Sequence, residues 1–299
     1  MKKTLSILVL LLTLFSSTGC LKKDDLDGAK IYTTVYPITY IVETLYGENS
    51  QISSIYPNGS DVTNYKLNNK QIDEYSKANI FVYNGLSQEK EIAKNFLNKN
   101  KDLKILDVAY GLKYKNGIEE LWLSPANYLM LASTTKNNLI DIIENKYLVE
   151  TIEKNYNVLE EQLSIMDAEL RTIASSSNKN SNELIVSSNV FKFLENYGFK
   201  VISLEDEENL STNNLATIKG NFKSKKYTSI FVRSDEEKSD LVKDLIDNYD
   251  VKVIEVNTMN TLTDENVNNK ETYFSIMENF LENIRNVTLG WWKSSFCID

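Results

Sequence analysis

The stretch that decides the fold is KIYTTVYPITYIVETLYG, residues 30–47. Its first part is rich in β-branched and aromatic residues and predicts a strand over Lys30–Tyr36. Its second part predicts a helix over Ile38–Tyr46, which ends where Gly47 interrupts the pattern. A strand followed directly by a helix is the unit from which parallel α/β sheets are built.

This alternation continues along the next hundred or so residues. A helix start is predicted at Ser124, because serine is a good N-cap and Pro125 suits the first helical position. Helical pattern then runs to Glu144. The other elements predicted here are strands over Gln51–Ile55, Ile80–Tyr83 and Lys104–Asp107, and helices over Asn69–Lys77 and Glu89–Asn98.

A long helix is predicted over Tyr147–Ser175, because apolar residues recur there at spacings of three and four. A polar loop, Ser175–Asn182, follows it, and the strand–helix pattern then begins again. Residues 187–198 loosely repeat residues 33–47, from a strand through small polar residues into a helix that ends at Tyr-Gly. The predicted elements are strands over Leu184–Ser187, Lys200–Leu204, Tyr227–Val232 and Val251–Val256, and helices over Val190–Asn196, Glu236–Tyr249 and Glu271–Asn286.

We therefore expect an α/β protein with two Rossmann-like lobes, each a parallel sheet with flanking helices, and a ligand cleft between them. The N-terminal lobe would span residues 29–146 and the C-terminal lobe residues 178–299. A spine helix over residues 147–177 would join the two lobes.

The N-terminus has the pattern of a secretory signal over residues 1–20. Lys2 and Lys3 precede the apolar run Leu5–Phe15, and four small residues lead into Cys20. The run is shorter than the roughly 20 residues that span a bilayer. Cys20 resembles the lipidated cysteine of a bacterial lipobox, although Ser17 stands where that motif usually has leucine. We expect an extracytoplasmic protein, lipid-anchored to the bacterial cell membrane through Cys20 with residues 21–28 as a tether; an ordinary signal with an incidental cysteine is the alternative.

Composition excludes several classes of protein. The net charge of −9 argues against a nucleic-acid partner, which requires clustered Lys and Arg. The chain contains no histidine for acid–base work and no nucleophile motif or phosphate loop, so we do not expect an enzyme. Lipidation of Cys20 would leave Cys297 without an intramolecular partner. We expect a monomer without disulfides, in which the tail at Trp291-Trp292 is buried.

A ligand site is expected in the loops after Ile55, Tyr114, Val186 and Val256, because open α/β sheets bind ligands at the carboxyl ends of their strands. In these loops and beside them the chain resembles the zinc and manganese solute-binding proteins of ABC transporters, a family that is often described as adhesins. The matching segments follow the family order over the whole mature chain. They are 33–37, 55–61 with Asn64-Tyr65, 78–86, 122–125, 185–191 and 229–232.

The resemblance implies a metal held in the cleft by histidines and carboxylates, and an ABC permease as partner. The family ligand positions correspond to Thr63, Glu120, Ser188 and Asn257, so none of the four family ligands is present. Tight zinc sites need Cys or His ligands. No cofactor is therefore certain: the four positions could form a weak oxygen site for a divalent cation such as calcium or magnesium. The favoured interpretation is that they are turn and cap residues and that Glu119-Glu120 is a solvated pair.

Three further residues are candidates for the cleft: Asp61, Trp122 and Arg233. Arg233 could pair with an anionic ligand, but a surface ion pair with Asp235 or Glu236 is favoured. Trp122, with Tyr36 and Tyr65, could line a pocket for an organic ligand, and packing is again favoured. Two functions remain open: a solute-binding lipoprotein of a metal-type ABC importer whose altered site takes a different ligand or none, and a surface adhesin that reuses the scaffold.

Overall fold

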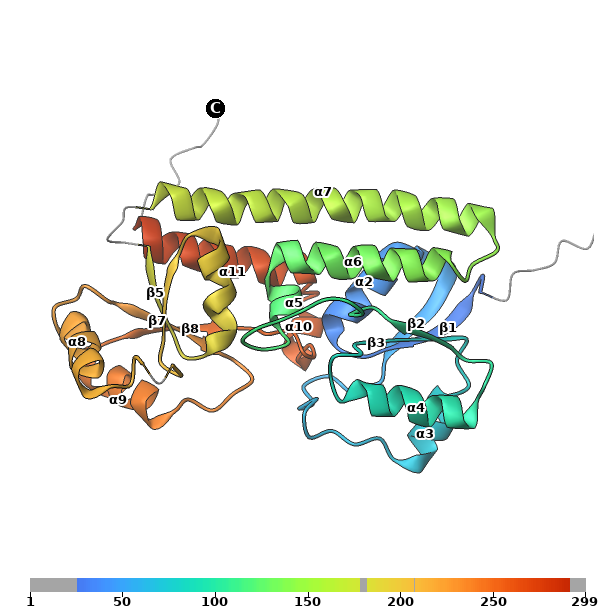
Figure 1. Ribbon diagram of the computed structural model, residues 1–299, viewed down its shortest axis with the longest axis horizontal. Coiled ribbons are helices and arrows are strands. Elements are labelled where there is room, and N and C mark those ends of the chain that lie inside the picture. Colours follow the sequence, from blue (N-terminus) through green and yellow to red (C-terminus); the bar gives the residue numbers. More distant parts are fainter. Residues whose placement is uncertain (1–25, 178–181, 207, 291–299) are drawn as a thin grey trace, which may run out of the picture.

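The computed structural model describes residues 26–177, 182–206 and 208–290. Two sheets lie side by side beneath one long helix (Figure 1). Cys20, most of the expected tether, Trp291-Trp292 and Cys297 lie outside the described residues, so the expectations for them stay expectations. Within the described part, no helix is long and apolar enough to cross a membrane.

The first sheet contains four parallel strands in the order β2-β1-β3-β4. Its buried central strand β3 is apolar throughout, as expected for a strand covered on both faces. The strands are β1 (Ala29–Thr33), β2 (Ser50–Ser54), β3 (Ile80–Tyr83) and β4 (Lys104–Asp107).

The second sheet repeats this arrangement, with four parallel strands in the order β6-β5-β7-β8. The repeat inferred from residues 33–47 and 187–198 is therefore a repeat of topology, and the α/β prediction is confirmed. In both sheets the strand order reverses between the first and third strands, which is where open α/β sheets bind ligands. The strands are β5 (Glu183–Val186), β6 (Lys200–Ser203), β7 (Ser229–Arg233) and β8 (Lys252–Val256).

Helices cover both faces of the first sheet. On one face α2 and α6 pack between the sheet and α7, and on the other α3 and α4 pack together (Figure 1). Ser124 is the N-cap of α6, with Pro125 in its first turn, as predicted. The helices of this half are α2 (Tyr36–Tyr46), the 3-10 helix η1 (Gly47–Asn49), α3 (Asn69–Tyr75), α4 (Glu89–Lys99), α5 (Glu120–Leu123) and α6 (Pro125–Ile140).

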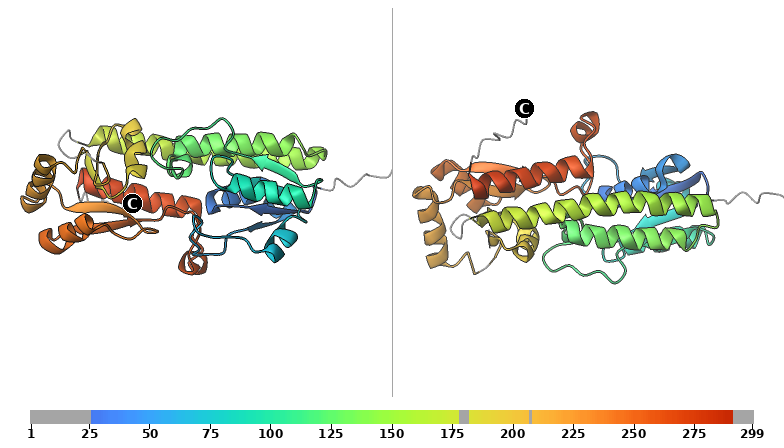
Figure 2. Two further views of the ribbon diagram at one scale, coloured as in Figure 1. Left: turned by 60° about the horizontal axis from the view of Figure 1, so that its bottom comes forward. Right: turned by 90° about the horizontal axis from the view of Figure 1, so that it is seen from above.

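The long helix α7 (Lys146–Ser176) runs over both halves of the molecule, and α11 lies beside it (Figure 2). One hydrophobic core includes Ile31 of the first sheet, Leu163 of α7 and Phe231 of the second sheet, so the two halves share a continuous interior. A smaller core lies on the outer face of the second sheet, under α8 and α9. The remaining helices are η2 (Asn189–Tyr197), α8 (Thr212–Lys223), α9 (Asp240–Tyr249), α10 (Asp264–Asn268) and α11 (Tyr273–Leu289).

Several predicted elements need correction. The helix expected over Val190–Asn196 is the 3-10 helix η2, and α9 begins at Asp240 instead of Glu236. Helix α8 was not predicted, because only Ile218 and Phe222 of its twelve residues are buried and its apolar pattern is weak. The first strand ends at Thr33, three residues earlier than expected, because α2 begins at Tyr36, with Pro37 in its first turn.

Candidate functional site

The two halves of the molecule meet at the segment that follows β8, here called the β8 loop (residues 257–262). Its backbone carbonyls accept hydrogen bonds from the first half: Asn260 from the Tyr36 amide at 3.2 Å, Leu262 from the Gly59 amide at 2.8 Å. The loop is also fixed from within, since the Met259 amide donates to the Asn257 Oδ1 at 2.8 Å. The sequence had placed a ligand loop here, after Val256.

Arg233 is the charged centre of this junction. It is the last residue of β7, and its guanidinium donates to the Glu119 Oε1 at 2.8 Å and the Asp235 Oδ2 at 2.9 Å. A third carboxylate, that of Glu236, lies 3.2 Å away. The side chains of Arg233 and Glu119 are only 11% and 10% exposed. Because Glu119 immediately precedes α5 in the first half, the Arg233–Glu119 ion pair joins the two halves.

Polar side chains of the β8 loop complete this cluster. The Thr258 hydroxyl donates to Asp235 at 2.7 Å, and the Asn260 Nδ2 donates to Asp235 at 3.0 Å and to Glu119 at 3.3 Å. We call Arg233, Glu119, Asp235, Thr258 and Asn260 the junction cluster. The donors of the cluster therefore satisfy two carboxylates that come from different halves of the protein.

Electrostatics keep the junction cluster charged. Burial alone would raise the pKa of Asp235, but hydrogen bonds from Arg233 and Thr258 hold it below its usual value. Burial alone would lower the pKa of Arg233. The hydrogen bond to Asp235 and the charge of Glu119 outweigh this effect, so the pKa lies above its usual value. The guanidinium of Arg233 is consequently the one cation of the cluster, and it faces carboxylates from both halves of the protein.

The four positions that the resemblance matched to family metal ligands are each engaged by different partners. The Glu120 carboxylate accepts from the Lys115 and Asn116 amides, at 2.9 and 3.1 Å. Ser188 is the N-cap of η2, and its hydroxyl lies 2.9 Å from a Glu205 carboxylate oxygen. The Asn257 Nδ2 donates to the Asn266 Oδ1 at 3.1 Å, and Thr63 lies in an exposed turn in which its amide donates to Asp61 at 2.9 Å.

No shared coordination sphere is therefore formed by these four side chains. Within residues 26–177, 182–206 and 208–290, no group of three or more Cys, Asp or Glu residues is placed to hold a metal ion, and the chain contains no histidine. The residues present do not fit a tightly bound transition metal, which requires nitrogen or sulfur ligands.

One expectation about charged residues was wrong, and another was incomplete. Glu119 and Glu120 are not a solvated pair, since they are 8% and 5% exposed and each has its own hydrogen-bond donors. Arg233 pairs with Asp235 and Glu236 at the surface, as expected, but it has a third, buried partner in Glu119 that was not predicted. Glu119 lies 114 positions away in the sequence, so no local pattern could have identified it.

Of the other candidate cleft residues, some pack in the interior or form a turn, and one lines a cavity. Trp122 is 1% exposed, and its indole N–H donates to the Thr258 carbonyl at 2.7 Å, so it packs at the junction. Asp61 is exposed and accepts hydrogen bonds within its own turn. Tyr65 is half-buried with its ring edge against Tyr56, whereas Tyr36 lines a cavity of about 400 Å³ beside the junction.

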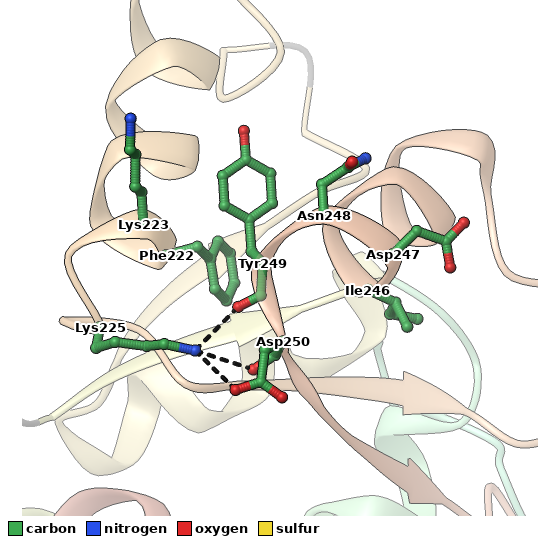
Figure 3. Close-up of a pocket in the computed structure, with 8 residues that line it drawn as sticks. All are labelled: Phe222, Lys223, Lys225, Ile246, Asp247, Asn248, Tyr249 and Asp250. Carbon is green, nitrogen blue, oxygen red and sulfur yellow. Dashed lines mark hydrogen bonds and ion pairs between the residues drawn. The ribbon is translucent and has the colours of Figure 1, made fainter.

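A larger hollow, about 660 Å³, opens on the far side of the second sheet between α8 and α9 (Figure 3). Phe222 and Tyr249 line it, together with Lys225. The Lys225 ammonium is already bonded to the Asp250 carboxylate at 2.9 Å and to the Tyr249 carbonyl at 3.2 Å. Lys225 is therefore not free to bind a ligand in this hollow.

Residues 31–287 match the family described as zinc-uptake complex component A, periplasmic (ZnuA). The chain belongs to this family. Among solved structures, the fold is similar to that of the Zn(II)-bound ZnuA-like domain of Streptococcus pneumoniae AdcA, with a TM-score of 0.70 and 22% identity over 87% of this chain and 98% of that one. It is also similar to the metal-dependent lipoprotein YcdH of Bacillus subtilis, with a TM-score of 0.71 and 20% identity over 87% and 99%.

Relatives by sequence include two lipoproteins. The zinc-binding lipoprotein AdcA of Streptococcus pneumoniae is 25% identical over 96% of this chain and 61% of its own length. The manganese ABC transporter substrate-binding lipoprotein PsaA of Streptococcus anginosus is 24% identical over 78% and 82%. The resemblance inferred from the sequence motifs is thus confirmed. In this member of the ZnuA family an arginine lies where the two halves meet, and the sequence contains no histidine.

Proposed function

We propose that this ZnuA-family chain is an extracytoplasmic, lipid-anchored solute-binding protein of an ABC importer whose interlobe site no longer takes a transition metal. The observation that carries the proposal is the buried ion pair between Arg233 and Glu119. A guanidinium joins carboxylates from both halves of the molecule, and so supplies internally the positive charge that a bound cation would bring.

The chemistry of the donors supports this interpretation. A divalent cation near the junction would be repelled by the guanidinium of Arg233 and would compete with it for Glu119 and Asp235. The positions matched to family ligands offer two hydroxyls, one amide and the carboxylate of Glu120. That carboxylate already accepts hydrogen bonds from the amides of Lys115 and Asn116. Oxygen ligands of this kind suit zinc poorly.

Native mass spectrometry and thermal unfolding test the proposal. Zinc, manganese, calcium and magnesium are added separately to the mature protein, with AdcA as a positive control for zinc. We expect neither a stoichiometric ion nor a rise in melting temperature. Binding would be easy to detect, since a ligand at a hundred times its Kd stabilises the native state by about 2.7 kcal/mol. A saturable rise with zinc or manganese overturns the proposal.

The importer role has its own test. We expect the gene for this protein to lie beside genes for a permease and an ATPase. The folded protein should co-purify with that permease, and the unfolded chain should not. A solitary gene and no permease contact would favour the surface-interaction role instead.

A further inference from the structure

The cavity lined by Tyr36 lies beside the junction cluster. Its volume is about 400 Å³, within the usual range for small-molecule sites. We call it the tyrosine pocket, because Tyr36, Tyr40 and Tyr56 line it, together with Glu43, Glu271 and Lys270. The tyrosines and Glu43 come from the first half of the molecule. Glu271 and Lys270 come from the segment between α10 and α11.

Aromatic faces surround part of this cavity. The rings of Tyr36 and Tyr40 lie 6.0 Å apart with their planes tilted by 53°, and Tyr40 also lies 6.0 Å from the ring of Phe274. Tyr36 and Tyr40 are only half-buried, so their rings are partly open to the cavity. Tilted aromatic rings of this kind attract a cation within about 6 Å of their faces.

Negative charge accompanies these rings. Glu43 and Glu271 provide two carboxylates against the one ammonium of Lys270. The Glu271 carboxylate accepts a hydrogen bond from the Ser275 hydroxyl at 2.7 Å. Within the described residues, the Glu43 carboxylate forms no hydrogen bond or ion pair, and it lines the cavity from a solvent-exposed position on α2. An unpaired carboxylate next to aromatic rings is a site for a positively charged partner.

We infer that the tyrosine pocket binds a small organic cation that carries an ammonium group, with Tyr36 and Tyr40 against the cation and Glu43 as its counter-charge. This inference rests on the proposed function and names the cargo class. A metal ion fits less well, because the pocket contains neither nitrogen nor sulfur ligands of the kind that transition metals require.

Both halves of the molecule line the pocket. Thr261 and Leu262 of the β8 loop face the same cavity as Tyr36 and Tyr56. A ligand there would contact both halves and stabilise their present arrangement by linkage. An importer receptor needs such a dependence of its shape on its cargo.

The test uses tetramethylammonium and n-butylammonium as probes, with the neutral tert-butanol and sodium chloride as controls. Binding to the mature protein is followed by ligand-observed NMR and by melting temperature. We expect saturable binding of the cations at millimolar concentration or below and no binding of tert-butanol. Failure of both cations, or equal binding of tert-butanol, overturns the inference.

Variants assign the binding to the pocket. Glu43→Gln and Tyr40→Leu should each weaken the affinity for the cation by about tenfold or more, since each removes about 1–2 kcal/mol of attraction. Tyr40→Phe retains the aromatic face and should retain most of the affinity. Glu48→Gln, a change at an exposed carboxylate of η1 outside the pocket, is the matched control. Unchanged affinity in both Glu43→Gln and Tyr40→Leu places the cation elsewhere and overturns the inference.

The outcomes also separate this inference from the proposed function. If zinc or manganese binds stoichiometrically, the proposed function fails, whatever the ammonium probes do. If neither metals nor ammonium probes bind, only the cargo class fails.

Discussion

Glu89 shows how far the surroundings of a single residue can change its chemistry. It is the first residue of α4, its side chain is 3% exposed, and its carboxylate accepts a hydrogen bond from the Asn84 amide at 2.8 Å. Burial disfavours the charged form and raises the pKa of Glu89 to about 7, which the hydrogen bond from Asn84 only partly opposes.

The raised pKa predicts that stability falls as pH rises. Between the ordinary pKa of 4.5 and about 7, the native state retains the Glu89 proton while the unfolded chain loses it. The contribution is therefore complete below the lower value and is lost as pH rises through the higher one, a change of roughly 3 kcal/mol at most.

Urea denaturation at a series of pH values measures this change in the free energy of unfolding. Glu89→Gln is the matched variant, because it keeps an acceptor oxygen for Asn84 and does not titrate. Relative to the variant, the wild type should lose stability as the pH rises from about 4.5 to about 7. Parallel pH profiles for the two proteins would contradict the assignment.

Arg233 illustrates what the sequence predicts at the level of a residue. Its pairing with Asp235 and Glu236 follows from their closeness in the chain, whereas its contact with Glu119 depends on how the two halves are placed. Adjacent acidic residues usually indicate a solvated surface. The burial of Glu119 and Glu120 is possible only because distant or backbone donors satisfy each carboxylate.

Elements were predictable where a strong local signal defined them. The ranges of β3 and β4 agree with prediction because short apolar runs are bounded by turn residues, and Gly198 ends η2 in a left-handed conformation, with a φ of 106°. Helix α8 escaped prediction because it presents a mostly polar surface and contains Gly220. Its position is set by packing Phe222 under the second sheet, which is tertiary information.

Helix α7 provides an element-scale prediction. Leu163 is 0% exposed in the shared core, whereas Ile165, two residues later in the same helix, is 61% exposed. Leu163→Ala should reduce the free energy of unfolding by about 2–5 kcal/mol, because the substitution leaves a cavity in a core that neighbouring elements cannot fill. Chemical denaturation followed by circular dichroism measures the loss.

Ile165→Ala is the control for this change, since it removes an apolar side chain of similar size from the same helix. Its effect should stay within about 0.5 kcal/mol, because exposed positions contribute little packing and alanine favours the helix. Equal losses in the two variants would show that helix propensity, and not burial against both halves, governs the stability of α7.

At the scale of the whole molecule, the repeated strand order was foreseeable, but the joint between the halves was not. Periodicity and turn residues predict two similar α/β units and a spine helix. How closely the units approach depends on contacts such as Tyr36–Asn260 and Trp122–Thr258, which join residues more than a hundred positions apart. These contacts also create the junction cluster and the tyrosine pocket, so both had to be found in the folded molecule.

The joint itself yields the last prediction. Arg233→Met leaves the buried carboxylate of Glu119 without its cation, and should cost about 3–5 kcal/mol of stability, as expected when one partner of a buried ion pair is removed. Lys238→Met is the control, because the Lys238–Glu255 pair is 32% and 58% exposed and should contribute no more than about 1 kcal/mol.

A double variant separates loss of the cation from loss of packing. If the cost of Arg233→Met comes mainly from the unpaired negative charge of Glu119, then adding Glu119→Gln should recover part of the lost stability. Urea denaturation of the wild type, the two single variants and the double variant should give a coupling energy of about 0.5–3 kcal/mol. Additive losses would show that Arg233 and Glu119 stabilise the junction independently. The guanidinium would then be a packing element of the second half, and could not be the cation that holds the two halves together.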